Sequence, residues 1–135
     1  MRLRASSIVA ALAWFALLTA TSHAQTAGST ALLQKWDGDH DGTLSLDEAK
    51  TAASAEFDKL DADHDGTLTE KELGGRLSHR GFESADPDHD GTLSKEEYLS
   101  VVGRRFRAAD PDKDGTIDAK ELDGKAGHLL SRLLS

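Results

Sequence analysis

Two stretches of the chain place apolar residues at the spacing of a helix face. They cover residues 49–60 and 98–109, and each is twelve residues long. Apolar side chains recur three or four positions apart in both, which is the period of an amphipathic helix. These apolar positions are Ala49, Ala52, Ala53, Phe57, Leu60, Tyr98, Val101, Val102, Phe106 and Ala109. We therefore predict one helix in each stretch and an all-α fold.

The stretch between these two helices, Leu73–Ala85, breaks the pattern. It has thirteen residues, so its apolar positions slip by about 100° around a regular helix. It also contains Gly74, Gly75 and Gly81, and each glycine weakens a helix by about 1 kcal/mol relative to alanine. We predict a bend or break here that returns the chain antiparallel.

The N-terminal residues have the three parts of a secretory signal peptide. A basic start at residues 1–4 is followed by an eleven-residue apolar run, Ile8–Leu18, and by small residues at Ser22 and Ala24. The apolar run is shorter than the roughly 20 residues that a membrane-spanning helix needs. We predict that residues 1–24 are cleaved, and that residues 25–135 form one domain in the periplasm or outside the cell.

The C-terminal residues 127–134 are rich in leucine. Leu129, Leu130, Leu133 and Leu134 would lie on one side of a helix, which favours a helix that caps the core. A helix that lies on a membrane surface is the alternative, but the segment is short and contains a single arginine, Arg132.

Four polar segments lie around these stretches and repeat one another. They cover residues 37–48, 61–72, 86–97 and 110–121, and their first residues are 24, 25 and 24 positions apart. Each has aspartate at positions one, three and five, glycine at six, an apolar residue at eight and glutamate at twelve. This is the spacing of an EF-hand Ca²⁺ loop, in which oxygen atoms surround one hard cation.

Each loop therefore supplies a predicted set of metal ligands. Positions one, three and five give single carboxylate oxygens, position seven its backbone carbonyl, and position twelve two oxygens. Position nine acts directly or through a water molecule. The predicted ligands are Asp37, Asp39, Asp41, Thr43, Ser45, Glu48, Asp61, Asp63, Asp65, Thr67, Thr69, Glu72, Asp86, Asp88, Asp90, Thr92, Ser94, Glu97, Asp110, Asp112, Asp114, Thr116, Asp118 and Glu121.

The charge of the chain is concentrated in these loops. Of its 24 acidic residues, twenty lie in the four loops. The net charge of −8 becomes −10 when Arg2 and Arg4 leave with the signal peptide, and four bound Ca²⁺ ions would bring it to −2. Such acidity argues against nucleic acid as a partner, because phosphate recognition needs basic patches. We predict up to four Ca²⁺ ions, no nucleic-acid partner, and no membrane association after signal cleavage.

Other residue types exclude further classes of function. The chain has no cysteine, so disulfides cannot stabilise it and no thiol can serve as a nucleophile. It contains neither an HExxH zinc motif nor a glycine-rich phosphate loop. We predict that the protein is not an enzyme.

The short helices restrict how the loops can pair. A helix of twelve to fifteen residues is a rod of roughly 20 Å, so the loops at its two ends cannot contact each other. With a bend in Leu73–Ala85, loop two (61–72) would pair with loop three (86–97), and loop one (37–48) with loop four (110–121). Without metal, the loop carboxylates repel one another across a thin core. We therefore predict a fold that depends on metal.

The mature chain resembles lanmodulin, a family of periplasmic EF-hand proteins that bind lanthanides. The resemblance rests on the twelve- and thirteen-residue connectors, on the absence of cysteine, and on DPDKDGTIDAKEL in loop four. Pro111 and Pro87, at position two of loops four and three, match the family's mark. The resemblance implies binding of trivalent lanthanide ions such as La³⁺, folding on binding, and a three-helix bundle with loops paired two-three and one-four.

Some loop positions depart from that family. Position two is Gly38 in loop one and Ala62 in loop two. Position nine is serine or threonine in loops one to three, and only Asp118 in loop four has the family's aspartate. Loop four therefore offers five carboxylates where the other loops offer four. A plain calcium protein is the alternative: a calcium sensor, or a calcium-stabilised structural module, with a protein partner that the sequence does not identify.

Several residues outside the ligand set also have candidate roles. His40, His64 and His89 stand at position four of their loops. They are either a second metal site or, as we favour, exposed side chains. We expect Trp36 to pack at a helix end beside loop one. A basic cluster on 104–107 is either a partner site or, as we favour, a solvated face.

Overall fold

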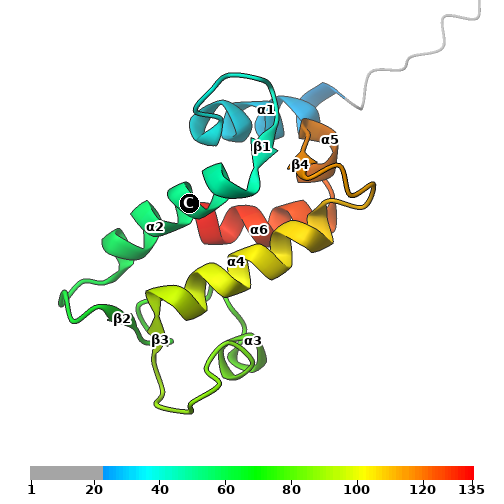
Figure 1. Ribbon diagram of the computed structural model, residues 1–135. Helices are drawn as coiled ribbons and strands as arrows, with labels where there is room; N and C mark the ends of the chain where they lie inside the picture. The colour runs from blue at the N-terminus through cyan, green and yellow to red at the C-terminus, as the bar shows by residue number, and fades with distance from the viewer. Residues whose placement is uncertain (1–22) are drawn as a thin grey trace, which may run out of the picture.

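The computed structural model describes residues 23–135, and Figure 1 shows their arrangement. Its helices are α1 (His23–Trp36), α2 (Leu46–Leu60), α3 (His79–Glu83), α4 (Lys95–Ala109), α5 (Ala119–Leu122) and α6 (Lys125–Leu134). Its strands are β1 (Leu44–Ser45), β2 (Thr67–Leu68), β3 (Leu93–Ser94) and β4 (Thr116–Ile117). The predicted signal peptide lies largely outside the described residues. No helix in the described part of the chain has the length and apolarity to cross a membrane.

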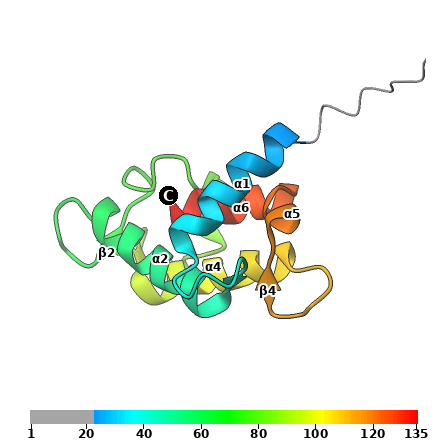
Figure 2. The ribbon, with the colours of Figure 1, turned by 90° about the horizontal axis from the view of Figure 1, so that it is seen from above.

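The two apolar stretches form the helices α2 and α4, which extend the predicted ranges by a few residues at their first turns. Each helix begins directly after a loop strand and ends where the next loop begins, at Asp61 and Asp110. The two helices run antiparallel and side by side (Figures 1 and 2). The rings of Phe57 and Tyr98 meet edge to face between them, 5.7 Å apart at their centroids. One helix therefore serves two loops, as its length predicts.

The four short strands form two antiparallel pairs at opposite ends of these helices. β1 pairs with β4, placing Leu44 opposite Ile117, and β2 pairs with β3, placing Leu68 opposite Leu93. All four of these apolar side chains are fully buried. They stand at position eight of their loops, so the pairs join loop one to loop four and loop two to loop three.

The middle connector has no helix directly after loop two. The chain turns through residues 70–78, and only the short helix α3 follows. Gly74 and Gly75 adopt φ values of +55° and +79°, which side chains other than glycine adopt at a cost. These two glycines therefore account for the break that the sequence predicts here.

Helix α6 lies across α2 and α4 and closes the core. It buries Leu130, Leu133 and Leu134, and the Tyr98 hydroxyl donates to the Leu133 carbonyl at 2.7 Å. The prediction that all four leucines share the buried side is wrong for Leu129, which is 39% exposed. Successive residues are separated by 100° around a helix, so Leu129 stands at the edge of the face that Leu130 centres.

Candidate metal centre

Each loop gathers three carboxylates into one cluster. The residues at positions one, three and twelve offer oxygen atoms that lie within 4.8 Å of one another. In every loop the first aspartate is buried, the second is exposed and the glutamate is half-buried. The clusters are Asp37, Asp39 and Glu48; Asp61, Asp63 and Glu72; Asp86, Asp88 and Glu97; and Asp110, Asp112 and Glu121. Acidic oxygens at this spacing form the donor set that Ca²⁺ and similar hard cations prefer.

Backbone geometry holds the first aspartate in place. The amide of Gly42 donates to Asp37 Oδ2 at 2.9 Å, and the amide of Gly115 donates to Asp110 Oδ2 at 3.1 Å. The glycine at position six has a φ between +84° and +92° in all four loops, which explains its place in the repeat. The residues at position four also have positive φ, between +57° and +61°. The side chains of His40, His64 and His89 are exposed, as we expected.

The glutamate at position twelve accepts a hydrogen bond from the position-nine amide in every loop. In loop one, Glu48 Oε1 accepts from the Gly38 amide at 2.7 Å and Oε2 accepts from the Ser45 amide at 2.9 Å. The Ser45 hydroxyl donates to Glu48 Oε2 at 2.8 Å. It also accepts from the Glu48 amide at 3.3 Å, which completes a capping box at the start of α2.

Position nine therefore has a role that the ligand prediction did not include. Ser94 and Asp118 cap the helices α4 and α5 in the same way, with Glu97 and Glu121 as partners. Thr69 makes the same hydrogen bonds with Glu72, although a turn follows it. The serine or threonine three residues before a glutamate is the sequence signature of a capping box and could have revealed this role.

Positions five and seven are joined by hydrogen bonds of their own. Asp41 Oδ1 accepts from the amide and the hydroxyl of Thr43, at 2.8 and 2.7 Å. The other three loops repeat both contacts. The described structure thus gathers positions one, three and twelve, whereas positions five, seven and nine lie in hydrogen bonds within the loop. The full set of ligands remains a prediction.

Loop four differs from the other loops at its first aspartate. In loops one to three, Oδ1 of this residue accepts from the amide of position five at 3.2 Å. In loop four, Asp110 Oδ1 is buried and has no hydrogen-bond partner among residues 23–135. A buried carboxylate oxygen without a partner is costly, and a bound cation would satisfy it. The residues of loop four therefore fit a metal ion.

The pKa of the position-twelve glutamate is shifted in opposite directions in loops four and one. Burial raises the pKa of Glu121, and the carboxylates of Asp112, Asp118 and Asp110 raise it further. Burial also raises the pKa of Glu48, but hydrogen bonds from Ser45 and Gly38 outweigh it, so this pKa lies below its usual value. Like charges raise the pKa of an acid and an added cation lowers it. Like charge therefore acts on Glu121 in loop four, whereas hydrogen bonds dominate at Glu48 in loop one.

The other candidate residues pack as follows. Trp36 is 7% exposed at the end of α1, as expected. In the basic cluster, Arg104 and Arg107 are exposed, whereas Arg105 is half-buried and donates to the Leu129 carbonyl. This hydrogen bond from Arg105 therefore connects α4 to α6.

Comparison with known proteins agrees with the loops. The family model described as EF hand matches residues 55–77, 80–102 and 104–123. These three matches contain loops two, three and four, whereas loop one lies outside them but has the same carboxylate cluster. No curated protein matches the chain. The EF-hand matches and the four clusters together support metal binding of the calcium type.

Proposed function

We propose that this chain is an exported EF-hand protein that binds Ca²⁺ and trivalent lanthanide ions in its four loops. The twenty-four residues predicted as ligands would surround the ions, and the chain would fold as they bind. In this proposal the protein handles or sequesters metal in the periplasm. Its folded state is a lanmodulin-like bundle in which β1 pairs with β4 and β2 pairs with β3, joining the loops.

The observation that carries the proposal is the repetition of one carboxylate cluster in four separate loops. An acidic cluster on a protein surface is common, but four copies with the same burial pattern and the same turn geometry indicate a shared task. Asp110 Oδ1 adds a buried acceptor that has no partner in the described part of the chain.

The dependence of the fold on metal follows from charge. Positions one, three, five and twelve hold sixteen carboxylates in the four loops. Their mutual repulsion opposes compaction, and bound cations would remove it. Ligands that bind only the native state stabilise it by mass action, by about 2.7 kcal/mol per site at 100 times Kd.

The lanthanide part of the proposal rests on loop four. Coulomb energy scales with the product of the charges, so a trivalent ion gains more from each added carboxylate than Ca²⁺ does. Asp118 gives loop four a fifth carboxylate, and Asp110, Asp112 and Asp118 already crowd Glu121. Loop four is therefore where selectivity for trivalent ions should be strongest.

A competition titration tests the metal preference. Apo protein is titrated with La³⁺ against Ca²⁺, while circular dichroism and tryptophan fluorescence report folding. We expect La³⁺ to bind more tightly and to displace Ca²⁺. Equal affinities would favour the plain calcium protein instead.

Two matched variants locate the preference. Asp118→Ser should reduce the preference for La³⁺ at loop four. Ser94→Asp should raise it at loop three, since the added carboxylate occupies the same loop position. No change in either variant would contradict the role assigned to position nine.

Export is tested separately, with the chain expressed under its own N-terminus. N-terminal sequencing of the periplasmic fraction should find Gln25 as the first residue. Protein that keeps Met1 and stays in the cytosol would contradict export and leave the metal measurements unaffected.

A further inference from the structure

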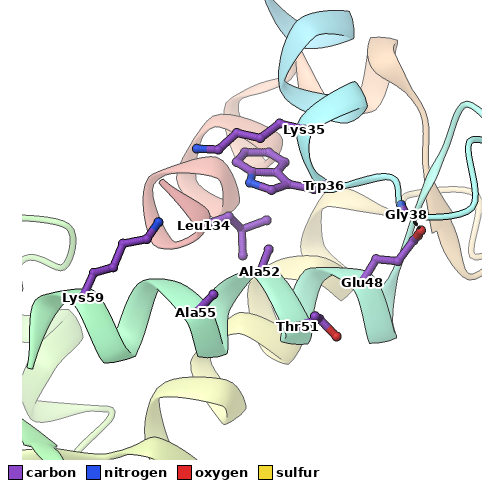
Figure 3. Close-up of a pocket in the computed structure, with 9 residues that line it drawn as sticks. All are labelled: Lys35, Trp36, Gly38, Glu48, Thr51, Ala52, Ala55, Lys59 and Leu134. Atoms are coloured by element: carbon purple, nitrogen blue, oxygen red, sulfur yellow. Dashed lines mark hydrogen bonds between the residues drawn. The ribbon is translucent and has the colours of Figure 1, made fainter.

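A pocket of about 310 Å³ opens near loop one, and Glu48 of that loop's carboxylate cluster lines one end of it. Its walls come from the end of α1, from the middle of α2 and from the last turn of α6 (Figure 3). Trp36, Ala52 and Leu134 form its apolar part. Pockets of 300 Å³ and more are typical of sites for small molecules.

Small side chains on α2 create the space. Ala52 is half-buried and Ala55 is exposed, so the groove between them and Trp36 is filled by no side chain of α2. Trp36 and Leu134 are 7% and 2% exposed, which gives the pocket a firm apolar wall. An apolar ligand of modest size would therefore be shielded from water on several sides.

One end of this pocket is cationic. Lys35 and Lys59 reach from α1 and α2, and Figure 3 shows both side-chain nitrogens at the same end of the pocket. Lys35 Nζ lies 5.9 Å from the centre of the Trp36 ring and makes no ion pair among the described residues. Lys59 Nζ contacts Glu56 at 2.9 Å, but its side chain is 65% exposed. Two ammonium groups beside an apolar pocket favour an anion, in a chain whose net charge is −8.

The other end of the pocket is acidic, and its carboxylate already accepts a hydrogen bond from the backbone. Glu48 lines it, and its Oε1 accepts the Gly38 amide at 2.7 Å. A ligand with one negative charge would therefore place that charge at Lys35 and Lys59 and keep it away from Glu48.

The wall of the pocket also holds a donor without an acceptor. Trp36 Nε1 is buried and has no hydrogen-bond partner among the described residues, although buried indole nitrogens usually have one. In Figure 3 this nitrogen points toward Leu134 and α2. A small shift of the indole on ligand entry would let a ligand oxygen accept from it.

We propose that this pocket binds a small organic monocarboxylate with an apolar body. The body lies against Trp36 and Leu134, and the carboxylate lies between Lys35 and Lys59. This site adds a function beyond metal binding, and its existence does not depend on which metal the loops prefer.

Isothermal titration of naphthalene-2-carboxylate into the Ca²⁺-loaded full chain tests the proposal. We expect saturable binding with one ligand per chain. Two related probes separate the sources of affinity. Naphthalene-2-carboxamide keeps the body without the charge and should bind at least about tenfold more weakly, which equals about 1.4 kcal/mol. Acetate keeps the carboxylate without the body, and it should not compete.

Variants place the ligand in this pocket. Lys35→Ala and Lys59→Ala should each weaken binding by about tenfold. Ala55→Leu should abolish it by filling the groove from an exposed helix position that tolerates leucine. Lys71→Ala is the matched control, because Lys71 is exposed and does not line this pocket. The affinity of this variant for the ligand should equal that of the unaltered chain. Circular dichroism of each variant confirms that it folds.

Three results would overturn the proposal. Binding of the amide as tightly as the acid would remove the role of the lysines. Acetate competing on equal terms would assign the carboxylate to a metal ion in a loop. Sedimentation that shows a dimer, with the dimer lost in Ala55→Leu, would assign the pocket to a second copy of the chain.

Discussion

The two ends of the molecule, each built from a pair of loops, hold helix α6 by different means. At the end where loops one and four meet, the start of α6 is held by close packing. At the end where loops two and three meet, its last turn is held by hydrogen bonds from charged and polar side chains (Figure 2). The same repeated loop therefore has two different surroundings, which the loop sequence itself does not specify.

The packed end depends on Gly127. A Cβ atom at this position would overlap the backbone of Glu121 and Leu122. The Ser29 hydroxyl donates to Asp123 Oδ1 at 3.2 Å, which joins α1 to this end.

The hydrogen-bonded end depends on arginine and tyrosine. Arg76 donates to the carbonyl of Ser135 and to Glu56 Oε1, each at 2.9 Å. Arg132 donates to the Gly75 carbonyl at 2.6 Å, and Tyr98 donates to Leu133. Long side chains can move, whereas backbone contacts at Gly127 cannot, so we expect the packed end to tolerate change less well.

Removing the metal should have the largest effect, because it acts on both ends at once. Four sites at 100 times Kd contribute about 11 kcal/mol, which is comparable with the whole stability of a domain. We expect a strong chelator to abolish most of the helical circular dichroism. Identical spectra with and without chelator would contradict a metal-dependent fold.

Gly127→Ala should be the most damaging single substitution at the packed end. The added methyl group meets backbone atoms that cannot rotate away, and overpacking costs about 1–3 kcal/mol. Gly28→Ala is the matched control, since nothing lies within 4 Å of its Cβ position in α1. That control should be neutral or stabilising by up to about 1 kcal/mol, as measured by thermal unfolding of the loaded protein.

Arg76→Ala tests the hydrogen-bonded end. Glu56 is 6% exposed, and loss of a partner of a buried charge costs about 3–5 kcal/mol. Lys59 still contacts Glu56 and the Arg76 side chain is 25% exposed, so we expect a smaller loss of about 2 kcal/mol. Arg80→Ala, at an exposed arginine, should leave the unfolding free energy unchanged. An equal loss of unfolding free energy in both variants would show that the Arg76 contacts do not specifically stabilise this end.

The pH dependence of stability tests Tyr98. Burial raises the pKa of Tyr98 from 10.0 to about 12. Because the folded state favours the neutral phenol, this stability is fully present below pH 10 and is lost as pH rises toward 12. The loss amounts to about 3 kcal/mol.

The tyrosinate absorbance reports this group alone, since Tyr98 is the one tyrosine of the sequence. Tyr98→Phe should remove the loss of stability between these pH values. Titration near pH 10 in the folded protein would show that the hydroxyl is open to water.

Ser29→Ala should have the smallest effect of this set. It removes one hydrogen bond to Asp123, which is worth about 1 kcal/mol. Ser100→Ala, at an exposed position of α4, is its control. A difference between the two variants in thermal unfolding would show that this hydrogen bond stabilises the packed end, and equal values would show that it does not.

The repeats and periodicities predicted the helices α2 and α4, the break after loop two and the carboxylate clusters. These features depend on local rules: residue spacing around a helix, glycine in left-handed conformations, and oxygen ligands at fixed loop positions. The prediction for Leu129 was wrong because a short run of leucines does not show where the centre of the buried face lies.

Other features depend on distant contacts and left no local signal. Glu56 and Ser29 are polar residues on helices, a residue type that is usually exposed. Both are buried, and their hydrogen-bond partners lie far along the chain. The pocket beside Trp36 arises because the C-terminal helix ends against α2. Only the capping role of position nine had a sequence signature, the serine or threonine before glutamate.

The shared helices have a consequence for how ions bind. Loop one leads through α2 to loop two, β2 and β3 join loop two to loop three, α4 leads on to loop four, and β4 and β1 return to loop one. These four connections form a closed cycle, so every loop has two neighbours and none is terminal. Two separate structural paths therefore connect each loop to the opposite one. Severing either route, for example with a flexible insertion in α2, should weaken communication between sites without ending it.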